Sequence, residues 1–82
     1  MSLRLSIATR LIPEQAIERA AAYFSGELGL QTAWRSPISA RFEGGGGHVQ
    51  LTAAPTSDGS ELELETREWE FQVRKFAADL PH

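Results

Sequence analysis

Several residue types are scarce or missing in this chain of 82 residues. There is no cysteine, lysine is represented by Lys75 alone, and no apolar run approaches the roughly 20 residues of a membrane-spanning helix. The missing cysteine excludes disulfides, thiolate nucleophiles and cysteine-ligated metals. The formal net charge of -3 argues against a general affinity for nucleic acid or anionic lipid, because those partners reward clustered cations. Since the N-terminus also lacks a secretion-signal pattern, we expect a cytoplasmic protein with no nucleic-acid or membrane partner.

The composition is that of a folded globular domain. Hydrophobic residues make up 41% of the chain and charged residues 23%, and the apolar residues recur periodically. The length suits one hydrophobic core and is too short for two. We therefore expect residues 1–82 to form a single domain.

The periodicity of the apolar residues changes along the chain. Leu3, Leu5 and Ile7 alternate with polar residues at the period of two that is typical of a half-buried strand. The same alternation returns in four further segments, whereas two others carry apolar residues at helical spacing. The pattern predicts, in order, a strand near 3–8, a helix from 13 to about 28, strands near 30–35, 38–43, 48–53 and 61–65, and a helix ending at 80.

Local signals mark the ends of the two helices. Pro13 suits the first helical turn, and glycine at Gly26 or Gly29 can end the first helix. We expect Thr66 to cap the second helix, which stops before Pro81.

Four successive strands joined by short turns predict an antiparallel meander with one apolar face covered by the two helices. The expected fold is a two-layer α+β domain with the order β-α-β-β-β-β-α. In topology alone it resembles the TATA-binding-protein-like group and a shortened helix-grip fold. The resemblance implies a five-stranded antiparallel sheet in the order 1-5-4-3-2. Arg4 would then lie beside a glutamate row, Glu61, Glu63 and Glu65, where a cross-strand pair contributes about 0.2–1 kcal/mol.

Three polar features of the sequence are candidate sites. Gly44–Gly47 lacks the lysine and helix of a phosphate-binding loop, which favours a hairpin turn. His48 has only the terminal His82 as a second histidine, which favours a solvent-facing side chain over a ligand or base. The glutamate row can hold a hard cation or act as an acid–base pair, but a linear row on one strand favours a solvated surface. We therefore predict no catalytic residue, metal or cofactor.

The aromatic residues suggest two further surfaces. Phe71 projects from the side of the last helix opposite its apolar stripe, near Lys75, and Tyr23 lies off the stripe of the first helix. These three residues form the predicted interaction surface, in which Phe71 and Tyr23 are a patch if they are neighbours. Trp34 either closes the core, which we favour, or lines a shallow pocket with Trp69 and Phe76.

The missing catalytic set and Phe71 together indicate a small binding or protein-interaction domain rather than an enzyme. We expect it to self-associate or to bind a protein partner through an edge strand or the outer helical aromatics. The alternative is a binder of a small apolar ligand, or a minimal enzyme, with its pocket between sheet and helices at Trp34, Trp69 and Phe76.

Overall fold

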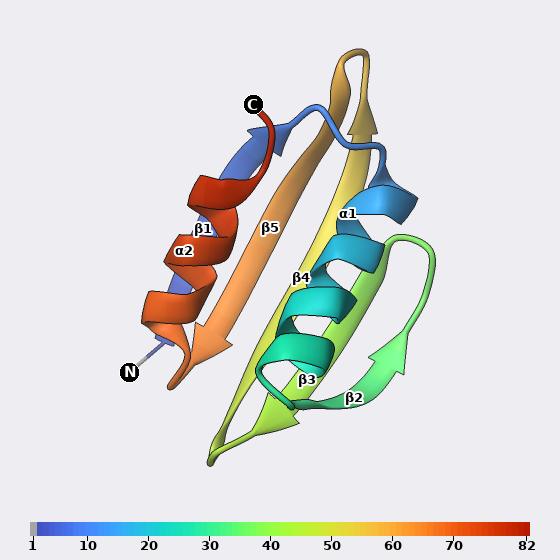
Figure 1. Cartoon of the computed structure of the whole chain (residues 1–82). Helices are drawn as coiled ribbons and strands as arrows, with labels where there is room; N and C mark the ends of the chain where they lie inside the picture. The colour runs from blue at the N-terminus through green and yellow to red at the C-terminus, as the bar shows by residue number, and fades with distance from the viewer. Residues whose placement is uncertain (1) are drawn as a thin grey trace.

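The computed structural model of the protein describes residues 2–82 and confirms the predicted two-layer α+β architecture (Figure 1). All strand pairs are antiparallel, and the sheet order is β1-β5-β4-β3-β2. The elements are β1 (Ser2–Thr9), α1 (Pro13–Ala20), the π-helical η1 (Ala21–Glu27), β2 (Gln31–Arg35), β3 (Ser39–Gly44), β4 (Gly47–Thr56), β5 (Gly59–Arg67) and α2 (Glu70–Asp79).

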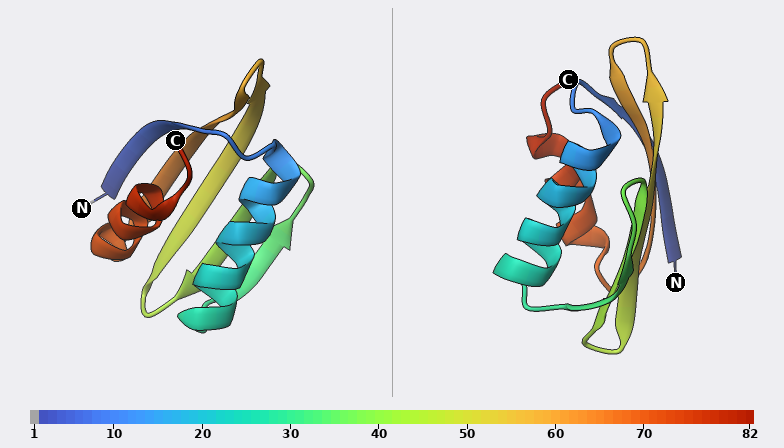
Figure 2. Two further views of the ribbon diagram at one scale, coloured as in Figure 1. Left: turned by 45° about the horizontal axis from the view of Figure 1, so that its top comes forward. Right: turned by 90° about the vertical axis from the view of Figure 1, so that its right-hand side faces the viewer.

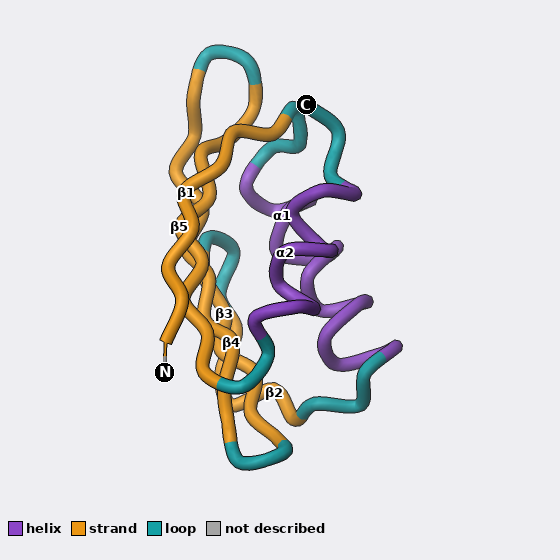
Figure 3. Tube along the Cα trace, turned by 90° about the vertical axis from the view of Figure 1, so that its left-hand side faces the viewer, coloured by secondary structure: helices purple, strands orange, loops and turns teal. Residues whose placement is uncertain are grey.

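The helices lie on one face of the sheet, and the other face has no covering layer (Figures 2 and 3). Helix α1 contacts β4 and β5, whereas α2 contacts β5 and β1. Alternate strand residues turn toward the helices, so that Leu62 and Leu64 are buried while Glu61 and Glu63 are exposed. None of the helices in residues 2–82 combines the length and the apolar character needed to cross a membrane.

The hairpin between β3 and β4 explains the glycine run. Gly44 pairs with Gly47, which leaves Gly45 and Gly46 as a two-residue loop with φ angles of 58° and 80°. Two successive positive φ angles are the requirement of the tight hairpin turn that matches strand twist. The prediction of a plain turn is therefore confirmed.

The first helix differs from the prediction in its second half. The chain changes at Ala21 from α-helical to π-helical turns, and the amide of Leu28 donates to the carbonyl of Tyr23. The wider turn brings Tyr23 against the core, where its ring meets Phe24 edge-on at 5.0 Å and stacks on Phe76 at 6.1 Å. The prediction that Tyr23 stands clear of the apolar stripe is wrong, because the turns at Tyr23 are wider than the 3.6-residue turns of an α-helix.

The expectation that Trp34 closes the core is also wrong. A β-bulge between Thr32 and Trp34 breaks the alternation, so that Thr32 lies opposite the buried Phe42 but Trp34 lies opposite Arg41. One extra residue moves every later side chain to the other face. Trp34 is consequently 43% exposed on the face away from the helices.

Thr66 is not a helix cap. It lies inside β5, fully buried, and its hydroxyl donates to the carbonyl of His48 at 2.7 Å. The chain turns at Glu68, whose φ is 78°, and α2 starts at Glu70. Strand β5 runs further than predicted because the buried hydroxyl has its partner within the sheet.

Trp69 connects the start of α2 to the β3–β4 hairpin, which lies at the same end of the sheet. Its indole Nε1 donates to the carbonyl of Gly44 at 2.9 Å. A Cβ at Gly45 would stand 2.9 Å from the Trp69 ring, so that the glycine hairpin also makes room for the indole. The tryptophan thereby ties α2 to the β3–β4 hairpin.

Trp69→Phe keeps the apolar ring but leaves the Gly44 carbonyl without its indole donor. We expect the free energy of unfolding to fall by about 0.5–1.5 kcal/mol. The matched control is Trp34→Phe, whose exposed ring should change stability by less than about 0.5 kcal/mol. Urea titrations of both variants measure the difference, and equal losses would contradict the role given to the Nε1 bond.

Thr66→Val preserves the shape of the buried side chain and removes its hydroxyl, so that the His48 carbonyl loses a partner. The expected loss of stability is about 1–3 kcal/mol. Thr52→Val, at an exposed position of β4, is the control and should stay within about 0.5 kcal/mol of the wild type. Thermal and urea unfolding report both values, and a neutral Thr66→Val would show that the bond adds nothing.

Candidate functional site

The uncovered sheet face is a mixed polar surface built from every strand. Residues that pair directly across the strands share this face, and one such row runs Arg4, Glu65, Gln50, Arg41 and Trp34. The glutamate of β5 in this row therefore lies between two arginines, with Gln50 separating it from Arg41. We call this surface the open face.

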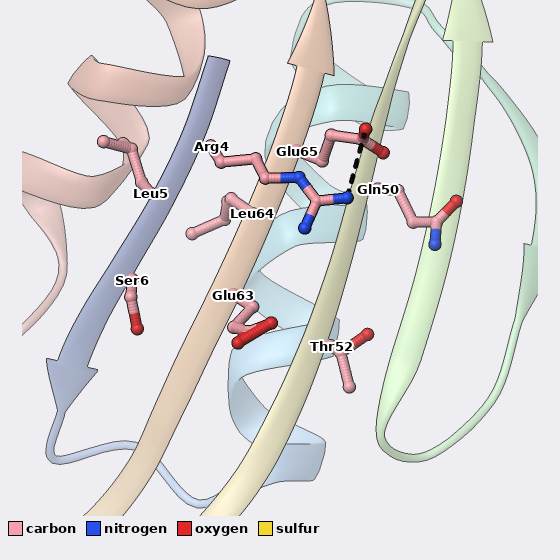
Figure 4. Close-up of a pocket in the computed structure, with 8 residues that line it drawn as sticks. All are labelled: Arg4, Leu5, Ser6, Gln50, Thr52, Glu63, Leu64 and Glu65. Atoms are coloured by element: carbon pink, nitrogen blue, oxygen red, sulfur yellow. Dashed lines mark ion pairs between the residues drawn. The ribbon is translucent and has the colours of Figure 1, made fainter. Parts of the chain in front are cut away.

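Neighbouring side chains of the open face pair with one another. A nitrogen of Arg4 lies 3.7 Å from a carboxylate oxygen of Glu65, which confirms the predicted position of Arg4 beside the glutamate row. Figure 4 shows the Arg4 side chain extended across β5 toward that carboxylate. Nearer the β2 edge of the same face, Arg41 donates to Glu43 at 2.8 Å and to Gln50 at 2.9 Å. Each exposed pair contributes at most about 1 kcal/mol, so the network shapes the surface more than it stabilises the fold.

A shallow depression of about 250 Å³ lies in the middle of this face, between β1, β5 and β4 (Figure 4). Its polar walls include Ser6, Thr52 and Glu63. The glutamates of β5 stand in line along it and do not converge on one point. Within residues 2–82, histidine, aspartate and glutamate side chains nowhere gather in a group of three suited to a metal ion.

His48 belongs to the open face but is largely covered by its neighbours, with 18% of its side chain exposed. Its Nε2 lies 3.6 Å from a carboxylate oxygen of Glu65 and has no hydrogen-bond partner. The predicted solvent-facing position is therefore right in direction and only partly right in exposure. Glu65 thus lies between His48 and Arg4.

The three residues of the predicted interaction surface fall into two groups. Tyr23 and Lys75 line a groove between the first helix and α2, where Lys75 also forms an ion pair with Asp79 at 3.3 Å. Phe71 is not among the residues that line this groove, and the residue is 72% exposed. Phe71 is therefore an isolated apolar residue on the outer side of α2.

The residues of the predicted pocket lie on opposite sides of the sheet. Trp34 belongs to the open face, whereas Phe76 is buried under the helices with its ring 5.2 Å from that of Phe24. Trp69 is occupied by its bond to the hairpin. The interior between sheet and helices is filled by tightly buried side chains, among them Phe24, Phe42, Ile17 and Leu51.

The two edges of the sheet differ sharply in their protection. Strand β2 has five residues and a bulge, which are two of the devices that prevent an edge strand from pairing further. Strand β1 has eight residues, contains no proline and pairs with β5 without any irregularity. Its one charged side chain, Arg4, leans inward over β5 (Figure 4).

Within residues 2–82, the outer side of the β1 backbone makes hydrogen bonds only near the end of the strand. The amide of Arg10, just after β1, donates to the carbonyl of Pro81 at 3.0 Å, and the carbonyl of Ala8 lies 3.1 Å from Nδ1 of His82. These contacts leave the segment from Ser2 to Ser6 as an open edge. On the helix side of this strand, Leu3, Leu5 and Ile7 are only half-buried.

Sequence reasoning placed the first strand at a sheet edge but did not single it out as a site. The signal was present in the order 1-5-4-3-2 combined with an uninterrupted alternation that contains no proline and no charged residue on its apolar side. The sequence does not reveal the bulge in β2. Only with this bulge known is it clear that the β2 edge is protected against further pairing and the β1 edge is not.

Comparison of the chain with protein-family models and with curated proteins gives no match in either case.

Proposed function

We propose that the protein is a non-enzymatic interaction domain that binds an extended protein segment along the outer edge of β1. The observation that carries the proposal is the long, regular and unguarded β1 beside a short and bulged β2. An added strand would satisfy backbone N–H and C=O groups that otherwise face water. The sheet would gain a sixth strand without any change in its core.

Side chains support the same mode of binding. Leu3, Leu5 and Ile7 face the helix layer but remain half-exposed because nothing lies beyond the edge. An added strand with apolar residues on this face would bury them further, at about 25 cal/mol per Å² of apolar surface. Affinity would come from the backbone bonds, and preference for a partner from these alternate positions.

The polar groups of the open face favour binding over catalysis. Glu65 faces Arg4 and His48, and Arg41 is held by Glu43 and Gln50. These groups neutralise one another along the strands, whereas a reaction requires them to converge on a substrate. The glutamate row and the net charge of -3 also favour a protein partner over a polyanion.

Titration with extended peptides tests this function. The probes are eight-residue peptides with alternating apolar and polar residues, including one with the sequence of residues 2–9, added to isotope-labelled protein in dilute solution. We expect the peptides to shift the amide resonances of Ser2, Arg4 and Ser6 with micromolar to millimolar dissociation constants. Scrambled peptides without alternation are the control. Binding elsewhere on the domain, or no binding by any peptide, would refute the proposal.

Ser6→Pro removes one backbone donor from the outer edge. The β1–β5 ladder should survive, because proline is tolerated where its missing N–H faces solvent. We expect peptide binding to weaken at least about tenfold, which is the effect of roughly 1.4 kcal/mol, while the unfolding transition stays cooperative. Unchanged peptide affinity in a folded Ser6→Pro variant would show that the outer edge of β1 is not the site.

A further inference from the structure

We infer that the segment bound at β1 is the β1 strand of a second copy of this chain, so that two domains form one continuous sheet about a two-fold axis. The inference rests on the proposed function and goes beyond it by naming the occupant and its register.

The direction of the backbone groups limits how two β1 strands can pair. The outward contacts at this edge come from the carbonyl of Ala8 and from the amide of Arg10, just after β1. These residues are two apart, so the backbone N–H and C=O groups that point outward belong to the even-numbered residues. The pairing of the other strands gives the same result. The amide of Ala53 donates to Ile38 on the β3 side of β4, so the odd-numbered residues of β4 direct their backbone groups away from β5. The pairings of β4 with β5 and of β5 with β1 then direct the backbone groups of the even-numbered β1 residues outward. A symmetric antiparallel pair must therefore set even-numbered residues opposite even-numbered residues.

Charge selects one register from this set. Pairing Arg4 with Arg4 of the second copy would place like charges directly opposite each other, which is destabilising. Moving the strands by one step sets Arg4 opposite Ser6 of the second copy, and Ser6 opposite its Arg4. This register also sets Leu5 opposite Leu5 of the second copy on the helix side. Its backbone bonds between Arg4 and Ser6 of the two copies lie within the open segment Ser2–Ser6, away from the outward groups of Ala8 and Arg10 that His82 and Pro81 already engage.

The same register makes the open faces electrostatically complementary. Within each domain Ser6 lies beside Glu63, and Arg4 lies beside Glu65. Arg4 of one copy would therefore stand between Glu65 of its own chain and, beyond a small serine, Glu63 of the second copy. Two-fold symmetry provides this arrangement twice. The exposure of Arg4, which is 80% in the single chain, leaves its side chain free to reach across.

Helix α2 supplies a second contact and accounts for Phe71. The side of α2 that faces the first helix carries Lys75 and Asp79, whereas Phe71, Arg74 and Ala78 form an exposed stripe at spacings of three and four on another side. Because α2 lies over β1 and β5, the two-fold axis brings the α2 helices of both copies alongside each other in antiparallel directions. Phe71 then approaches the small Ala78 of the second copy. The long side chain of Arg74 can extend from this contact into water.

A charge-pair experiment tests the dimer and its register together. Ser6→Arg sets a guanidinium directly opposite Arg4 of the second copy at both ends of the pair, while within one chain it gains a favourable neighbour in Glu63. Sedimentation equilibrium should show a wild-type dimer and a dissociation constant raised at least about tenfold in Ser6→Arg. Arg4→Glu, which faces Glu63 of the second copy, should weaken the dimer as well. Mixing the two variants should restore association, because opposite charges then meet.

Two further variants serve as controls on place and contact. Gln31→Arg adds the same charge to the exposed β2 edge and should leave the dimer unchanged. Phe71→Ala should weaken association about tenfold without loss of stability, since the ring is exposed in the single chain. Thermal unfolding of each variant shows that the domain remains folded.

The remaining outcomes separate this inference from the proposed function. A protein that stays monomeric at millimolar concentration overturns the dimer, and binding of peptides at β1 would then mean that the occupant is another protein. A wild-type dimer unaffected by Ser6→Arg, or one lost in Gln31→Arg, overturns the β1 pairing. Failure of the variant mixture to associate, with both single variants weakened, overturns the register.

Discussion

The structure depends on burying apolar side chains on only one face of a five-stranded sheet. The first helix, which runs from α1 into η1, and helix α2 cover that face, and alternation along each strand sends the remaining side chains to water. Leu51, Leu64 and Phe42 all turn to the helices while their neighbours form the open face. Buried side chains fill the core, so the exposed surfaces of the domain are its open face, its helices and its two edges.

The element order and the alternating burial along β1 and β3 to β5 were predictable because they follow from period-two and helical spacing summed over whole segments. The sheet order followed from the resemblance in topology. The errors arose where one residue changes a local rule. A bulge before Trp34 reversed its face, and π-helical turns brought Tyr23 inward. Thr66 has the chemistry of a helix cap, yet its hydroxyl found a carbonyl inside the sheet.

The candidate sites divide in the same way: those set by patterns over whole segments were predictable, and those set by a change at one residue were not. Arg4 beside Glu65 was predictable, since strand order and alternation determine that pair. The proposed pocket depended on the face of Trp34 and was lost with the bulge, whereas the exposure of Phe71 followed correctly from the wheel of a regular helix. The contrast between the two edges required the actual register of both strands, which local patterns do not contain.

Hydrogen exchange of the β1 amides tests the central claim, that β1 is an open edge closed by a second copy, most directly. In dilute solution the amides of Leu3, Leu5 and Ile7, bonded to β5, should be protected, while those of Arg4 and Ser6 exchange freely. Raising the protein concentration should protect Arg4 and Ser6 as well. Protection of these two amides in the monomer, or free exchange at every concentration, would contradict the account.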